Sequence, residues 1–418
     1  MDTKTVSQTM LSVAQAKQLV WQGIEPVQSI ELVDLDHALD RVLAEAVVSP
    51  INVPLQNNSA MDGYALVTEE SSLGAVIQQS KFHLVGTSYA GIPFYGQLKP
   101  GDCIRITTGA VVPKDATSIL IQENARIEEE FVYIRPGELC RVGEFIRLAG
   151  EDLQKDKQVF AAGRRLNSVD LGLLSSIGIT QVKVFAKPRV AVLSTGDELK
   201  QAGAELSDGE IYESNRIVLL SMLKKAHCDV IDLGIIPDDK LKIRDAFLQG
   251  DQLADLVICS GGVSVGDADF TREVVQQVGQ IGFWKVAAKP GKPFAFGTLP
   301  NSYFFGLPGN PVSTAVTFDL LVRIGLNKLA GQSEHSPAVV FYAELESPIK
   351  KQPGRAEFQR AIAYSDEQGL LKVRPLGNQS SGVLSSMSQA NCYLCLSAEQ
   401  GDMQVSERVE IQFFNQRF

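Results

Sequence analysis

The chain has 418 residues, a length that predicts roughly three domains. Its 44% hydrophobic and 21% charged residues are ordinary for a globular protein, and a net charge of −10 excludes a general nucleic-acid-binding role. No apolar run approaches the roughly 18 residues that span a membrane, and the opening MDTKTVSQTM lacks the apolar segment of a secretory signal. We therefore expect a cytoplasmic protein, without nucleic-acid or membrane partners, whose six cysteines are reduced thiols.

The first 185 residues divide into a helical start, a β-rich module and a returning connection. Ser12 is placed to cap a helix that continues as VAQAKQLV, and the pattern ELVDLDHALDRVLAE predicts a second helix over 31–45. Short β-like runs separated by Gly, Pro and Asp then predict a small all-β module over 51–150. Because the Gly-punctuated residues 151–185 resemble a connection back to the start, we assign 1–50 and 151–185 to one discontinuous connecting domain.

Residues 186–331 alternate strand and helix patterns as a doubly wound α/β domain does. The apolar runs RVAVLST, DVIDLGII and DLVICSGG predict strands, and SNRIVLLSMLKKA, DKLKIRDAFLQ and TREVVQQVG have helical spacing. The runs GFWKVAAK and SYFFGLPG follow, and a long helix over 313–331 closes the domain. The short strands of 332–418 predict a C-terminal β-barrel.

Three loops rich in glycine and proline mark the candidate site: SGGVSVGDADF (260–270), KPGKPFAFG (289–297) and GLPGNPVS (306–313). Glycine lets the backbone approach a ligand closely, and a helix N-terminus offers unpaired N–H groups to an anion. A ligand that carries phosphate is the natural interpretation. The candidate contacts are Ser260, Gly261, Gly262, Gly309, Asn310 and Pro311.

Acidic residues follow the predicted parallel strands, at the sheet edge where ligands bind in such folds. The acidic pairs are Asp197 and Glu198, Asp238 and Asp239, and Asp267 and Asp269, with Lys285 and Lys289 after the next strand. Carboxylates suit Mg²⁺, which needs only one or two of them together with phosphates and waters. The competing interpretation is that these residues cap helices or form a solvated rim.

Ten segments together carry a resemblance to a known family: NNSAMDGYA, RITTGAVVP, AGEDL, STGDEL, SNR, GIIPDD, SGGVSVGDADF, FWKVAAKPGKPFAFG, GLPGNPVS and GRAEFQR. They run from residue 57 to 360 in the family's order. The chain resembles the molybdopterin molybdenumtransferases, a family that includes MoeA and the E domain of gephyrin. The resemblance implies an elongated homodimer with four domains per subunit. Its α/β domain would resemble molybdopterin adenylyltransferases, and the connecting domain would dimerise.

The resemblance also implies a reaction. Molybdate and adenylylated molybdopterin would be the substrates, Mg²⁺ would assist hydrolysis of the adenylate, and AMP would be released as molybdenum is inserted. A molybdopterin adenylyltransferase and molybdoenzyme maturation proteins would be partners. The active site would lie between the α/β and C-terminal domains of one subunit and the β-module of the other.

Site residues follow from the resemblance position by position. The β-module and the segment after it would supply Asp62, Thr108 and Asp152. The α/β strand ends would supply Glu198, Asp238 and Asp269, both as catalytic residues and as metal ligands. Substrate binding would fall to Lys285, Lys289, Arg360 and Ser381, the lysines and arginine neutralising phosphate and molybdate. Asp267 stands where many members have Glu, which keeps the charge.

Two alternatives remain open at the level of sequence. The α/β domain also fits a molybdopterin adenylyltransferase that uses ATP, although such an enzyme would not need the β-module or the barrel. A molybdopterin-binding scaffold without catalysis is the other alternative, since gephyrin's related domain also gathers a receptor. Because the acidic residues at the sheet edge are all present, we favour catalysis.

Overall fold

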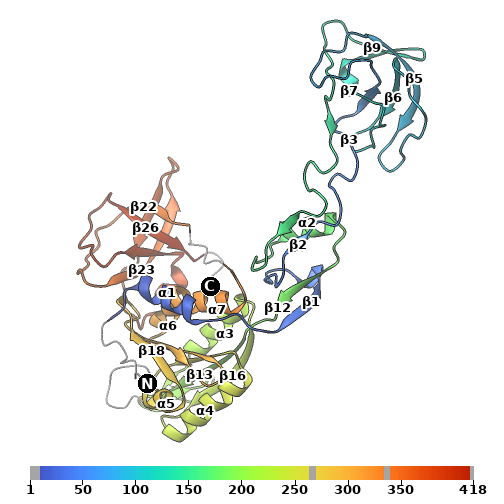
Figure 1. Ribbon diagram of the computed structural model, residues 1–418. Helices are drawn as coiled ribbons and strands as arrows, with labels where there is room; N and C mark the ends of the chain where they lie inside the picture. The colour runs from blue at the N-terminus through green and yellow to red at the C-terminus, as the bar shows by residue number, and fades with distance from the viewer. Residues whose placement is uncertain (1–9, 263–269, 334–338, 415–418) are drawn as a thin grey trace.

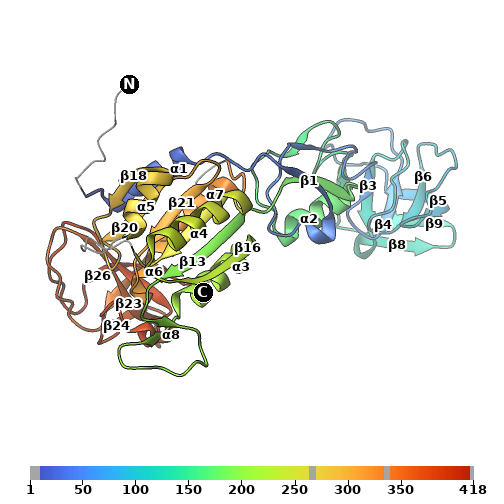
Figure 2. The same ribbon diagram turned by 90° about the horizontal axis from the view of Figure 1, so that it is seen from below.

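The computed structural model describes residues 10–262, 270–333 and 339–414. The molecule is elongated, with the β-module at one end and the α/β domain beside the C-terminal domain at the other (Figure 1). A 90° turn leaves this separation unchanged (Figure 2). Among the described residues, we find no helix with the length and apolar character that a membrane span requires.

Three short antiparallel ladders join the two ends of the molecule. The outgoing strands β1 (Ile30–Asp34), β2 (Val47–Val48) and β3 (Asn58–Ser59) pair in turn with the returning strands β12 (Gln181–Phe185), β11 (Gln158–Phe160) and β10 (Ile146–Arg147). The pairs are nested, because each later outgoing strand meets an earlier returning strand. The β-module is therefore an insertion carried at the far end of a two-stranded connection.

One of the two helices predicted near the start is present and the other is not. Helix α1 (Val13–Gly23) begins at Ser12, whose hydroxyl and the Gln15 side chain form a capping box, and it packs against helix α7 (Arg323–Leu329). The helix predicted over 31–45 is wrong: this segment forms β1 and a 3₁₀ turn, Leu35–His37. Pairing of β1 with residues 181–185 overrides the local helical pattern. Helix α2 (Ser168–Ser176) lies in the same connecting region.

The β-module is a six-stranded sheet in the order β7-β4-β6-β5-β9-β8. Its strands are β4 (Gly63–Leu66), β5 (Lys81–Ser88), β6 (Asp102–Ile106), β7 (Ser118–Ile121), β8 (Ala125–Glu128) and β9 (Phe131–Ile134). Alternate residues of β4 enter different cores: Tyr64 and Leu66 pack in one, and Ala65 packs in another. The sheet is thus covered by apolar residues on both faces, as the period of a strand requires.

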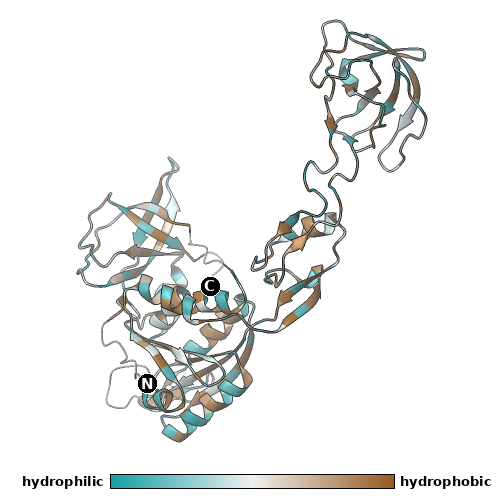
Figure 3. Cartoon of the chain, in the orientation of Figure 1, coloured by the Kyte–Doolittle hydropathy of each residue, from teal (hydrophilic) through white to brown (hydrophobic). Residues whose placement is uncertain are grey.

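The α/β domain is doubly wound, as predicted, around a six-stranded sheet in the order β16-β13-β17-β21-β20-β18. The strands are β13 (Arg189–Thr195), β16 (Asp229–Ile236), β17 (Leu256–Ser260), β18 (Gln280–Lys285), β20 (Pro293–Thr298) and β21 (Tyr303–Leu307). Helices α4 (Lys240–Leu253) and α5 (Phe270–Val278) cover one face, and α1, α3 (Asn215–Lys225) and α6 (Pro311–Thr317) cover the other. Hydrophobic residues concentrate along the strands between these layers (Figure 3).

Two local features of this domain differ from the sequence-based expectation. The sheet is mixed, because β20 runs antiparallel to both β21 and β18, and β20 occupies half of the segment expected to be a loop. The long closing helix is present but is three pieces: α6, a π-helical turn (Phe318–Val322) and α7. It begins at Pro311, whose missing N–H costs nothing at a first helical position.

The C-terminal domain is the predicted barrel. Strands β22 (Phe341–Leu345), β23 (Ala356–Ser365), β24 (Leu371–Pro375), β25 (Cys392–Leu396) and β26 (Arg408–Phe413) pair in the order β23-β24-β22-β26-β25, and β25 closes the ring on β23. Strand β19 (Ala288–Lys289) of the α/β domain adds to β23, and a short helix, α8 (Leu384–Gln389), lies against α6. Phe358 and Tyr393 of the barrel belong to the same core as α6 and α7, so the two domains pack as one unit.

Gly63 generates a stability prediction at the entrance to the β-module. A Cβ at this position would lie 2.0 Å from the backbone oxygen of Leu120 on the neighbouring strand, which cannot move aside. Gly63→Ala should therefore destabilise the module by about 1–3 kcal/mol, measured as a lower midpoint of thermal unfolding. Gly172→Ala is the matched control, because no atom lies within 4 Å of its added Cβ and alanine favours helix α2. Equal midpoints for the two variants would contradict the predicted clash.

Candidate active site

Carboxylates gather where β13 and β16 end. Asp197 and Glu198 follow β13, and Asp238 follows β16 as its parallel neighbour. The Asp238 N–H donates to Asp197 Oδ1 at 3.0 Å, which fixes the two loops together. Partial burial, and then the charges of Asp197 and Glu198, raise the pKa of Asp238 above its ordinary value. The cluster therefore holds more negative charge than its surroundings neutralise.

Asp239, the next residue, has a different role. Its side chain accepts hydrogen bonds from the N–H groups of Leu241 and Lys242 and caps helix α4. Those bonds lower the pKa of Asp239. Of the two interpretations of the Asp238–Asp239 pair, helix capping thus applies to the second residue, and the first remains available to a ligand.

The loops after β17 and β21 are tied together by a residue that sequence reasoning did not single out. Asn215 Nδ2 donates to Ser260 Oγ at 2.9 Å and to the Gly309 carbonyl at 2.7 Å. The only sequence signal for Asn215 was its place in SNR at the start of a predicted helix. Its amide fixes the distance between the two glycine-bearing loops, Ser260–Gly262 and Gly309–Asn310.

Two buried threonine hydroxyls face Gly262. It has φ of +64°, and a Cβ there would lie 2.1 Å from Thr271 Oγ1 and 2.9 Å from Thr195 Oγ1. Within the described part of the chain, neither hydroxyl has a hydrogen-bond partner, although Thr195 and Thr271 are 4% and 1% exposed. Glycine is thus required at this position, because the two hydroxyls pack directly against its backbone.

The start of helix α6 is less open to an anion than predicted. Pro311 has no N–H, and the N–H of Val312 donates to the Ser381 carbonyl at 3.1 Å. That hydrogen bond brings Ser381 of the C-terminal domain against the Gly309–Pro311 loop. The structure therefore places Ser381 next to the loop, and it uses one of the helix donors to do so.

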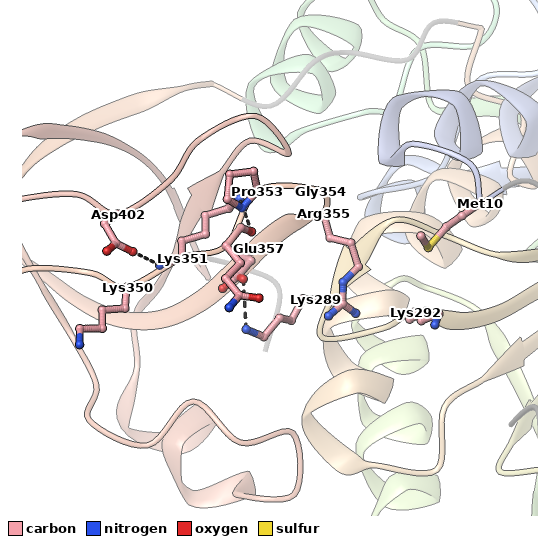
Figure 4. Close-up of a pocket in the computed structure, with 11 residues that line it drawn as sticks. Met10, Lys289, Lys292, Lys350, Lys351, Pro353, Gly354, Arg355, Glu357 and Asp402 are labelled. Carbon is pink, nitrogen blue, oxygen red and sulfur yellow. Dashed lines mark hydrogen bonds and ion pairs between the residues drawn. The ribbon is translucent and has the colours of Figure 1, made fainter.

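The predicted lysines lie near the outermost strand opposite the one that precedes Asp238, at the other end of the strand order. Lys285 ends β18, which is separated from β16 by five strand spacings, roughly 24 Å at about 4.8 Å each. Lys289 Nζ pairs with the buried Glu357 at 3.1 Å (Figure 4). The acidic and basic groups thus share an edge without touching, and only a long ligand contacts both.

Arg360 is held rigidly in the barrel. It is 1% exposed; Nε donates to Ser386 Oγ at 3.1 Å, and Nη2 donates to the carbonyls of Asn378 and Ser380 at 3.2 and 2.9 Å. Gln379 also clamps its backbone by bonding both the N–H and the carbonyl. Burial lowers the pKa of Arg360. The residue lines a cavity of about 350 Å³ together with Lys289.

The β-module and its neck carry the remaining predicted residues. Asp62 Oδ1 accepts hydrogen bonds from the Thr108 N–H at 2.7 Å and from its hydroxyl at 2.9 Å, and these bonds lower the pKa of Asp62. Asp152 lines a cavity of about 520 Å³ with Asn58 and Arg147. Figures 1 and 2 place the strands of the β-module, which carries Asp62 and Thr108, at the opposite end of the molecule from the α/β domain, whereas Asp152 lies between β10 and β11 in the neck.

Among the described residues, the ligand atoms of Asp34, Asp36 and His37 converge closely enough to hold a metal ion, but this group is exposed and is not part of the loops above. Asp267 and Asp269, the latter a predicted ligand, lie outside the described residues.

Comparisons with known proteins agree with this architecture. Family models match in chain order: the MoeA N-terminal region, domains I and II, over residues 11–178, a probable molybdopterin binding domain over 191–328, and the MoeA C-terminal region, domain IV, over 342–414. The α/β domain is thus of the molybdopterin-binding class.

Individual relatives define the family. The molybdopterin molybdenumtransferase of Haemophilus influenzae is 42% identical over 97% of this chain and 99% of its own length, and that of Nostoc is 33% identical over 89% and 86%. The crystal structure of a molybdopterin biosynthesis moeA protein from Pyrococcus horikoshii OT3 superimposes with a TM-score of 0.80 at 28% identity, covering 97% of this chain and all of the other. The chain belongs to the molybdopterin molybdenumtransferase family.

The Asp62–Thr108 contact generates a prediction about pH. A carboxyl with a lowered pKa contributes stability above its ordinary pKa and loses it as the pH falls through the lowered value. Thr108→Val removes the hydroxyl donor and keeps the shape and the N–H, so the pKa of Asp62 should rise toward its ordinary value. The measurement is a ¹³C NMR titration of the Asp62 carboxyl. Thr107→Val is the control and should leave that titration unchanged; an identical shift in both variants would show that the hydroxyl bond is not its cause.

Proposed function

We propose that this protein inserts molybdenum from molybdate into adenylylated molybdopterin, hydrolyses the adenylate and releases AMP. The observation that carries the proposal is the joined pair of loops after β13 and β16, where Asp238 has a raised pKa beside Asp197 and Glu198. Membership of the molybdopterin molybdenumtransferase family supports the choice of substrates.

The spacing of the charged groups fits a long anionic substrate. Phosphates bound near the carboxylates need a cation between the two negative groups, and Mg²⁺ is suited to carboxylate and phosphate oxygens. Glu198 and Asp238 would hold it, and Asp269 stays a third ligand predicted from the sequence. A bound Mg²⁺ would neutralise charge that develops on the phosphate oxygens during hydrolysis. At the other side of the sheet, Lys289 and Arg360 would orient the oxyanion to be inserted.

A second copy of the chain completes the site in this proposal. Asp62, Thr108 and Asp152 lie on the inserted module and its neck, far from the α/β domain of their own chain. An isologous dimer would bring each β-module against the partner's α/β and C-terminal domains. Asp62, kept ionised by Thr108, would then face the partner's substrate.

We further propose that the reaction takes place in the cytoplasm, where a molybdopterin adenylyltransferase would supply the substrate and molybdoenzyme maturation proteins would receive the product. Five of the six cysteines are buried, as is usual for the reduced thiols of a reducing compartment. An assay with ATP and molybdopterin separates this function from the adenylyltransferase alternative, and absence of AMP release from adenylylated molybdopterin would favour a scaffold.

Removing one carboxylate tests whether Mg²⁺ takes part in AMP release. Asp238→Asn should lower Mg²⁺-dependent AMP release by roughly 100-fold, because a metal supplies several kcal/mol of charge stabilisation. Because the pKa of Asp238 is raised in the folded state, the free energy of unfolding of the wild type should fall as the pH rises from the ordinary pKa of aspartate through the raised value. Asp238→Asn cannot ionise, so this variant should lose that part of the pH dependence. The measurements are AMP release against Mg²⁺ and thermal midpoints against pH.

The adjacent residue supplies the control for that variant. Asp239→Asn should keep both activity and stability, because asparagine also caps helices. Normal turnover of Asp238→Asn in excess EDTA would remove the role assigned to the metal.

Mixing two inactive variants tests the shared site. Asp62→Asn and Asp238→Asn, each inactive alone, should regain about a quarter of wild-type activity after subunit exchange, since about half of the dimers are mixed and each contains one intact site. AMP release and native mass spectrometry measure activity and exchange. Exchanged mixtures that stay as inactive as either parent would refute a site built from two chains.

A further inference from the structure

The start of helix α3 holds the loops of the candidate site in two separate ways. The first is the amide of Asn215, which is 9% exposed and donates to both the Ser260 hydroxyl and the Gly309 carbonyl. Because a carbonyl only accepts hydrogen bonds, the nitrogen of the Asn215 amide must face Gly309. Joining both acceptors from one atom takes two N–H groups, which the amide nitrogen supplies.

The acidic loop after β13 is held by other groups near the start of α3. The Ile211 N–H donates to the Glu198 carbonyl at 2.8 Å. The buried carboxylate of Glu213 accepts from the Ser194 hydroxyl of β13 at 3.0 Å. Neither bond involves the Asn215 side chain, so a change at Asn215 leaves these supports of the acidic loop in place.

The two glycine-bearing loops lie directly beside the end of β13. A Cβ at Gly261 would lie 2.6 Å from the carbonyl oxygen of Thr195, the last residue of β13, and a Cβ at Gly309 would lie 3.8 Å from the Cα of Gly261. Backbone thus meets backbone from one loop to the next. The space left for a ligand depends on how far apart these loops are held.

The loop after β21 is held from two sides. The hydroxyl of Thr314 in α6 donates to the carbonyls of Pro308 and Asn310 at 2.6 and 3.1 Å, and Asn215 binds the carbonyl of Gly309 between them. Gly309 itself is exposed, so without the amide its carbonyl can bond to water instead. The Asn215 bond therefore sets the orientation of this loop more than it sets the stability of the fold.

We propose that Asn215 is a positioning residue for substrate binding. Its amide holds the loops Ser260–Gly262 and Gly309–Asn310 at the separation that the phosphate-bearing part of adenylylated molybdopterin requires. The inference rests on the proposed function and adds to it the group that shapes the binding loops. Loss of the amide should weaken substrate binding and leave the metal site unchanged, because the acidic loop has its own supports.

The first experiment measures AMP release by Asn215→Ala. The KM for adenylylated molybdopterin should rise about tenfold, while kcat and the half-saturating Mg²⁺ concentration stay within about twofold of wild type. If Asn215→Ala does not fold, Asn215→Leu fills the same space without a donor and should show the same rise in KM. An unchanged KM, or an equal rise in the Mg²⁺ requirement, would overturn the proposal.

Asn391→Ala is the matched control. The Asn391 amide also joins two groups, the N–H and the carbonyl of Ala363 in the barrel, both at 2.8 Å. Because Ala363 is buried, this variant should lower the thermal midpoint and leave the KM unchanged. Asn215→Ala should show the opposite result, a raised KM with little change in the midpoint. The same rise in KM in both variants would show a general loosening and contradict a positioning role.

The second experiment measures binding and loop exposure without turnover. Adenylylated molybdopterin, followed by its pterin fluorescence in the absence of molybdate and Mg²⁺, should bind Asn215→Ala about tenfold more weakly than wild type. In the free protein, hydrogen–deuterium exchange of the segment 303–310 should be faster in the variant, and that of 193–200 should be unchanged. Equal acceleration of both segments would refute the separate supports. If binding weakens as expected but wild type releases no AMP, the proposed function fails and the positioning role stands.

Discussion

The nested pairing of outgoing and returning strands determines where everything else in this molecule lies. β1 pairs with β12, β2 with β11 and β3 with β10, so the chain runs out from the α/β domain and back along itself. A ribbon of this kind holds the β-module away from the α/β domain of the same chain. On the proposed function, residues at the tip of the molecule would act on a sheet edge in another copy of the chain. The proposal of a site built from two chains therefore rests on the backbone pairing as well as on the candidate residues.

The acidic and basic groups of the candidate site are also kept apart by the fold. The carboxylates lie at the β13 and β16 end of the sheet, and the lysines lie across the sheet near the barrel. Because the groups are separated, neither set neutralises the other, and Asp238 retains a raised pKa. On the proposed function, one end would bind a cation and the other an oxyanion. The proposed substrate, with phosphates and a long body, would link them.

The sequence predicted the parts of the fold that depend on local pattern. The strands of the α/β domain and the cap at Ser12 follow from periodicity and turn chemistry over a few residues. The two failures have different causes. Residues 31–45 have a helical pattern, but β1 pairs with strand β12 about 150 residues later. The Gly and Pro residues of 289–297 predicted a loop, although β20 pairs there with its sequence neighbours β18 and β21.

The candidate site shows the same difference between what local sequence indicates and what tertiary contacts determine. Resemblance named Asp62 and Thr108, but their contact depends on the pairing of β4 with β6, which places Gly63 opposite Ile106. No pattern in the sequence indicated that Asn215 joins two loops, or that Gln379 and Ser386 hold Arg360. Such residues act through tertiary contacts, and their chemical types are common in any chain. The candidate site residues could thus be named from the sequence, while the residues that position them required the structure.

The shared site is tested most directly by cross-linking with isotope labels. A photoreactive amino acid at position 108, in a dimer assembled from equal amounts of ¹⁵N-labelled and unlabelled chains, reports which copy of the α/β domain lies next to it. If the site is built from two chains, links to the segment 196–239 should include peptide pairs with one heavy and one light member, in about half of the linked pairs. Links formed only between peptides of the same isotope would show that each chain completes its own site.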